Sequence, residues 1–114
     1  MTKHKIVLVP FPFDDLSSAK VRPAVCLTDS IGPHKHIVVA FITSRVPTEP
    51  LPTDFIIADT ALEFAVTGLR VASTLQLHRM MTITTGLIMR ELGELPAGMQ
   101  GQVEKRLKVL FGIR

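Results

Sequence analysis

The sequence predicts a small, mainly β domain: a barrel or strongly twisted sheet with a helix packed at its C-terminal end. Three observations indicate this class. At least five short apolar runs are separated by turn residues, apolar side chains recur at helical spacing mainly near the end, and the chain has 114 residues. We expect one domain over residues 1–114, which buries roughly two-thirds of the surface of its unfolded chain.

The first predicted strand is the β-branched and apolar run at residues 6–9. It should stop at Pro10, because proline cannot donate a hydrogen bond to a sheet ladder. Pro12 and the polar side chains of Asp14, Asp15, Ser17 and Ser18 then favour turns over regular structure, so a loop is expected before the second strand.

Arg22 is the most informative residue of that second strand, which should begin near Val21. Pro23 removes one amide from the strand and favours extended geometry at Arg22, which suits a sheet edge or the start of a strand. The guanidinium should therefore lie at a rim of the sheet. An ion pair with Asp14 or Asp15 at the surface is the ordinary structural explanation of such a residue.

The middle of the chain predicts further strands. A turn is expected at residues 29–35, and the nearly continuous apolar run at residues 36–42 is typical of a strand buried on both faces. The polar residues 43–45 follow at the end of that strand and form a second candidate site. Three prolines between residues 46 and 54 predict an extended connection to a short strand at residues 55–58.

The remaining elements are expected at the following positions. Residues 60–67 are compatible with a short helix, residues 69–77 with a strand that residues 80–84 extend, and residues 88–92 with a strand or helical turn. A terminal amphipathic helix follows Pro96, because apolar residues recur there at helical spacing. Its apolar positions are Met99, Val103, Leu107 and either Leu110 or Phe111.

Composition limits the partners and the compartment. The excess of 13 Lys and Arg over 10 Asp and Glu gives a net charge of +3, which permits a polyanionic partner without requiring one. The single Cys26 lies in an apolar run, where a thiol usually packs as a small hydrophobe. No apolar run is long enough for a secretory signal or a membrane span, so a cytoplasmic location is expected.

Aromatic residues for stacking on nucleic-acid bases must be phenylalanines, because the chain has no Trp or Tyr. Phe11 and Phe13 lie in the predicted loop and are candidates for this role. The other four are expected to pack in the core. These are Phe41, Phe55, Phe64 and Phe111.

The ordered blocks of this sequence resemble the MazF/PemK-type toxins of type II toxin–antitoxin systems. The most specific block is Lys20-Val21-Arg22-Pro23 with its Phe11-Pro12-Phe13 lead. Residues 40–44, residues 73–77 and residues 92–95 resemble later blocks of the family in the same order. The likeness therefore extends over nearly the whole chain.

The resemblance implies a small SH3-like barrel with a C-terminal helix, of the MazF/PemK/CcdB type, that forms a homodimer. It also implies a sequence-specific endoribonuclease that cleaves single-stranded RNA without a metal or other cofactor and that a cognate antitoxin neutralises. By motif position, the catalytic pair is Arg22 and Thr43. The predicted RNA-binding residues are Lys20, Ser44, Arg45, Phe11, Phe13, Ser17 and Ser18.

Three alternatives stay open. His34 and His36 are candidate general bases, because histidine is the natural side chain for this role and the two stand two residues apart. A non-catalytic toxin of the same fold could instead poison DNA gyrase, since related barrels serve both tasks. A decayed toxin that only titrates antitoxin is disfavoured, because both Arg22 and Thr43 are retained.

Overall fold

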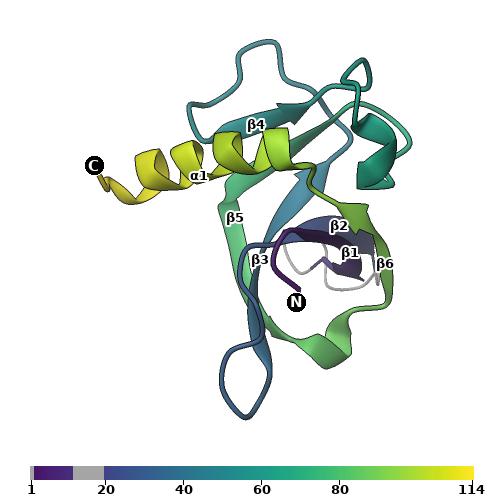
Figure 1. Cartoon of the computed structure of the whole chain (residues 1–114), viewed down its shortest axis with the longest axis vertical. Helices are drawn as coiled ribbons and strands as arrows, with labels where there is room; N and C mark the ends of the chain where they lie inside the picture. The colour runs from purple at the N-terminus through teal and green to yellow at the C-terminus, as the bar shows by residue number, and fades with distance from the viewer. Residues whose placement is uncertain (1, 12–19) are drawn as a thin grey trace.

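The structure, a computed structural model, describes residues 2–11 and 20–114. The described part is a six-stranded antiparallel sheet that curls into a half-barrel, together with one long C-terminal helix (Figure 1). The strand order is β4-β5-β3-β2-β1-β6. The predicted mainly β fold, a small curled barrel with a C-terminal helix, is confirmed.

The elements follow the predicted order with two differences. The strands are β1 (Lys5–Pro10), β2 (Val21–Cys26), β3 (His36–Thr43), β4 (Asp54–Ile57), β5 (Ser73–Thr84) and β6 (Arg90–Glu94), and the helix is α1 (Ala97–Phe111). Two short 3-10 turns are η1 (Phe64–Thr67) and η2 (Thr85–Leu87). The helix considered for residues 60–67 is therefore only one 3-10 turn, and the two segments predicted after it join into the single long strand β5.

Pro23 lies in an interior strand of the sheet, so the predicted edge position is correct only for the first half of β2. β2 pairs with β1 along residues 21–25, whereas it pairs with β3 only through Ala24, Val25 and Cys26. The missing amide of Pro23 thus falls where β2 has one paired neighbour instead of two. This half of the strand has the edge character that the proline requires.

The sheet is buried on both faces. One apolar cluster contains Ala40 and Ile42 of β3 and packs against α1, and the other contains Val39 and Phe41 of the same strand. Alternate residues of a strand point to opposite faces, so the continuous apolar run of β3 serves both clusters. Cys26 is free and fully buried in the second cluster, which confirms its predicted role as a small hydrophobe.

Helix α1 lies across the sheet beside β4 and β5 (Figure 1). Its apolar stripe is the predicted one: Met99, Val103, Leu107 and Leu110 pack against the core. Phe111 instead remains 60% exposed, so its predicted core position is wrong. Within the described residues, no helix combines the length and apolar character needed to cross a membrane.

Candidate functional site

Arg22 and Thr43 lie on either side of an opening in the sheet, where β2 and β3 cease to pair. The last pair is Ala24 with Phe41, and continuing this register by two residues brings Arg22 opposite Thr43. Among the described residues, β2 continues there along β1, with Arg22 opposite Val9, and β3 continues along β5. Residues two apart on a strand share a face, so both side chains project to the face that Phe41 occupies.

Aromatic rings support the Arg22 side of this opening. The Arg22 guanidinium carbon lies 5.5 Å from the centre of the Phe11 ring, and Phe11 packs edge-to-face on Phe41 with ring centres 5.0 Å apart. Phe41 is itself buried in the core. A cation over an aromatic face is attracted by the ring quadrupole, so this stack helps to orient the guanidinium.

The Thr43 side is held by two hydrogen bonds, one of them from the neighbouring strand β5. The buried Thr74 hydroxyl donates to the Arg45 carbonyl oxygen at 2.7 Å, and the Arg45 amide donates to the Thr43 hydroxyl oxygen at 3.3 Å. Thr74 also pairs with Thr43 across β3 and β5. The chain therefore turns sharply after β3 and keeps Arg45 beside the opening.

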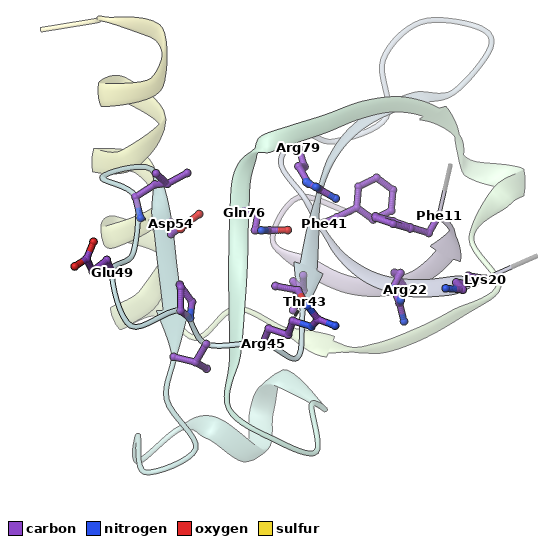
Figure 2. A pocket seen from close by; sticks show the side chains of 14 residues that line it. Phe11, Lys20, Arg22, Phe41, Thr43, Arg45, Glu49, Asp54, Gln76 and Arg79 are labelled. Carbon is purple, nitrogen blue, oxygen red and sulfur yellow. Dashed lines mark hydrogen bonds between the residues drawn. The ribbon is translucent and has the colours of Figure 1, made fainter. Parts of the chain in front are cut away.

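A cleft of about 950 Å³ extends along this face and is named the main cleft. Figure 2 shows its cationic side chains Lys20, Arg22 and Arg45 away from the carboxylates Glu49 and Asp54. Asp54 is buried and uses one carboxylate oxygen to accept the Leu51 amide at 2.9 Å. The cleft is lined by Phe11, Lys20, Arg22, Phe41, Ile42, Thr43, Arg45, Val46, Pro47, Glu49, Leu51, Asp54, Gln76 and Arg79.

A second cleft of about 570 Å³ shares Arg22, Ile42, Thr43 and Arg45 with the main cleft. We name it the arginine cleft, because it adds Arg70 and Arg90 to the two shared arginines. Hydroxyl groups of Thr43, Ser44 and Ser73 also belong to its lining residues. The two clefts therefore meet at the opening between β2 and β3.

A bulge in β5 brings two residues into the main cleft that sequence reasoning did not select. The pairing of β3 with β5 shifts between Ala40 opposite Met80 and Phe41 opposite Gln76, so three residues of β5 have no counterpart. Bulges of this kind bend a strand and redirect its side chains. Gln76 and Arg79 both line the main cleft, and strict alternation along the sequence gives no signal for such a shift.

The structure brings most of the predicted site residues together. Phe11, Lys20, Arg22, Thr43 and Arg45 line the main cleft, and Ser44 lines the arginine cleft. Phe13, Ser17 and Ser18 lie outside the described residues. Arg70 and Arg90 were not predicted as site residues. They lie far from Arg22 in the sequence, and only the fold brings their segments to the same cleft.

The histidine pair lies at the opposite end of β3 from Thr43. His34 and His36 have ring centres 5.9 Å apart, but His36 begins the strand that Thr43 ends, about 23 Å away at the usual rise of a strand. None of the four histidines lines either cleft in the described structure. No group of three or more His, Cys, Asp or Glu suited to a metal ion occurs among the described residues.

The chemistry of this surface suits a phosphate-bearing polyanion. Six cationic side chains line the two clefts: Lys20, Arg22, Arg45, Arg70, Arg79 and Arg90. Guanidinium groups donate paired hydrogen bonds to phosphate oxygens, and the Phe11 ring offers an aromatic contact beside them. The fold and the clefts therefore define a small β-sheet protein with a cationic binding surface around an opening in its sheet.

The chain belongs to the family of PemK-like, MazF-like toxins of type II toxin–antitoxin systems, whose family model matches residues 2–111. This result confirms the resemblance inferred from the ordered motifs. No curated protein matches the chain in a sequence comparison.

Solved structures share the fold at low sequence identity. The Mycobacterium tuberculosis toxin MazF-mt6 superposes with a TM-score of 0.74 at 24% identity, over 96% of this chain and 98% of that one. A mycobacterial endoribonuclease in complex with its cognate antitoxin gives a TM-score of 0.71 at 12% identity, over 100% and 97% of the two chains. A further M. tuberculosis toxin gives 0.66 at 24% identity, over 91% and 97%.

Proposed function

We propose that this toxin is a sequence-specific endoribonuclease that cleaves single-stranded RNA without a metal, with Arg22 and Thr43 as its catalytic residues. The observation that carries the proposal is their placement across the opening, within one cationic cleft. Family membership supports the reaction class, and one structural neighbour is described as an endoribonuclease.

In the proposed reaction, the ribose 2′-oxygen forms a bond to the adjacent phosphorus, and the bond from phosphorus to the 5′-oxygen breaks. The 2′-hydroxyl loses its proton and the leaving 5′-oxygen gains one. The products are a 2′,3′-cyclic phosphate and a 5′-hydroxyl end. Negative charge grows on the phosphate oxygens in the transition state, where donors held in place are most effective.

Arg22 supplies such donors. Its guanidinium offers two parallel N–H groups to the phosphate oxygens, and its contact with Phe11 restricts where it points. Thr43 holds a phosphate oxygen or the attacking hydroxyl. Neither side chain is an effective base at neutral pH, so proton removal uses water or another group.

The other binding residues have distinct roles in this proposal. Lys20 and Arg45 contact the RNA backbone, Ser44 contacts a phosphate, and Phe11 stacks on a base. Phe13, Ser17 and Ser18, which precede β2 in the sequence, complete the predicted RNA-binding set. The working form is a homodimer, and an antitoxin segment with acidic and apolar side chains inhibits it by covering the cleft.

The test is cleavage of a long, weakly structured RNA in EDTA by purified wild type and by Arg22→Gln and Thr43→Val. Discrete cuts with 5′-hydroxyl ends that both substitutions abolish support the proposal. Lys105→Gln is a charge-matched control for Arg22→Gln, because Lys105 is exposed on α1 and lines neither cleft. Absence of cleavage by folded wild type overturns the proposal.

The alternative target is a protein such as DNA gyrase, bound without catalysis. The exposed apolar side chains Val109, Phe111 and Ile113 at the end of α1 are the feature that such a toxin would use. In that case, Phe111→Ser would abolish toxicity while Arg22→Gln left it intact. The ribonuclease proposal predicts the reverse pattern.

A further inference from the structure

The arginine cleft differs from the main cleft in having no acidic residue. Its lining contains Arg22, Arg45, Arg70 and Arg90, whereas the main cleft contains Glu49 and Asp54 besides its cations. Four arginines around a volume of about 570 Å³ create a positive potential that attracts an anion, although three of them are exposed to solvent. The composition of the cleft therefore indicates an anionic occupant.

Three of these arginines are not neutralised within the described structure. The side chains of Arg45, Arg70 and Arg90 form no hydrogen bond or ion pair with any described residue. The nearest carboxylates along β6 are already engaged, since Glu91 and Glu94 lie 3.0 Å and 3.9 Å from the Lys5 ammonium group.

A structural arginine elsewhere in the chain shows the contrast. Arg106 donates to the Asp54 carbonyl oxygen at 2.9 Å and to the Gln102 carbonyl and side-chain oxygens. Its guanidinium also lies 5.2 Å from the centre of the Phe55 ring. Arg45, Arg70 and Arg90 lack this kind of anchoring at their charged ends among the described residues, so those ends are available to a ligand.

The backbone that carries Arg70 and Arg90 is nevertheless held in place. Gly68 adopts a positive φ of 73° and lies so close to β6 that an added Cβ would be 2.0 Å from the Leu92 carbonyl oxygen. This contact fixes the segment before Arg70 against the strand that begins with Arg90. Arg90 in turn lies opposite Leu8 of β1. The two arginines are thus presented from adjoining, closely packed segments.

We propose that the arginine cleft binds the phosphate next to the scissile one, with Arg70 and Arg90 as its ligands. The inference rests on the proposed function, because it names a second subsite for the same RNA strand. Arg22 and Thr43 line both clefts, so a strand whose phosphate lies at Arg22 carries a neighbouring phosphate towards Arg70 and Arg90. The guanidinium fork and the hydroxyl groups of Ser44 and Ser73 both match phosphate oxygens.

The experiment measures binding of an RNA oligonucleotide that carries a 2′-deoxynucleotide at the cut site and so cannot be cleaved. Fluorescence anisotropy over a series of salt concentrations compares wild type with Arg70→Gln/Arg90→Gln. We expect roughly tenfold weaker binding, because two charge-assisted contacts are lost. The slope of log affinity against log salt should fall by about 0.7, which is the loss of one phosphate contact to a single strand.

The matched control is Lys105→Gln/Lys108→Gln, which removes the same charge from exposed positions of α1. Its affinity and slope should remain near those of wild type. Arg70→Lys/Arg90→Lys should regain most of the salt slope and part of the affinity, because charge returns without the planar fork. Circular dichroism confirms that each variant is folded.

Several outcomes overturn the inference. Unchanged affinity and salt slope in Arg70→Gln/Arg90→Gln exclude a phosphate subsite. An equal loss of affinity in the α1 control shows that the effect comes from the overall charge of the protein and not from the cleft. If the substitutions weaken binding of an oligoglutamate peptide but not of RNA, the cleft takes an acidic protein segment. If wild type itself binds no RNA at low salt, the proposed function fails together with this subsite.

Discussion

Arg22 of β2 and Thr43 of β3 stand at opposing register positions, two residues beyond the last pair of their two strands. The sheet opens there because β2 continues along β1 while β3 continues along β5. The two predicted catalytic residues therefore stand on opposite sides of a space that no strand fills among the described residues. The proposed function requires that a phosphate bound in this space contacts both.

The contact between Phe11 and Arg22 should contribute to activity through orientation. Phe11→Leu removes the aromatic face under the guanidinium while it keeps an apolar side chain of similar size. We expect kcat/KM for RNA cleavage to fall roughly fivefold, which corresponds to about 1 kcal/mol for an exposed cation–π contact. Phe11→Tyr keeps the ring and should retain most of the activity. Equal losses in both variants would contradict an orienting role of the ring.

The close packing of β6 on η1 should make Gly93 intolerant of any side chain. A Cβ at Gly93 would lie 2.2 Å from the Val66 carbonyl oxygen, so the backbone would have to shift. Gly93→Ala should therefore lower the free energy of unfolding by about 2 kcal/mol, measured by urea denaturation. The control is Gly101→Ala in α1, where a Cβ meets nothing within 4 Å.

Gly101→Ala should instead raise the free energy of unfolding by about 0.5–1 kcal/mol, the usual gain from alanine inside a helix. Similar effects of the two substitutions would show that the approach of β6 to η1 is less close than the structure describes.

The buried thiol of Cys26 should make stability depend on alkaline pH. Burial in the second apolar cluster raises the pKa of this thiol to about 11. The unfolded chain loses the thiol proton at a lower pH than the folded chain, so the contribution of this group is complete below about pH 9. It should decline as pH rises from about 9 to 11.

The measurement is the urea midpoint at several alkaline pH values, compared between wild type and Cys26→Ala. We expect the wild type to lose more stability over this range than the variant loses. Parallel pH curves would indicate that the thiol ionises normally in the folded protein.

Sequence patterns predicted the parts of this fold that depend on local chemistry. The apolar run of β3, the stop at Pro10 and the stripe of α1 each follow from burial or backbone constraints within a few residues. Family motifs selected Arg22 and Thr43, and the register of β2 and β3 brings them to facing positions.

The parts that the sequence did not reveal depend on contacts between distant segments. Arg79 enters the main cleft through a bulge that appears only when β3 and β5 are paired. Arg70 and Arg90 line one cleft because Gly68 approaches β6, a contact that links the residues after η1 to the strand before α1. Pro23 suggested an edge strand, but partial pairing inside the sheet meets the same constraint.

The central claim is that Arg22 and Thr43 act together on one phosphate, and a double-mutant cycle on kcat/KM for RNA cleavage tests it most directly. The cycle compares wild type, Arg22→Gln, Thr43→Val and the double variant under single-turnover conditions. The effects of two groups that stabilise one transition state are strongly non-additive. The kcat/KM of the double variant should therefore be only slightly lower than that of the less active single variant. Losses that multiply, or a folded single variant with wild-type activity, would contradict a shared role at the opening between β2 and β3.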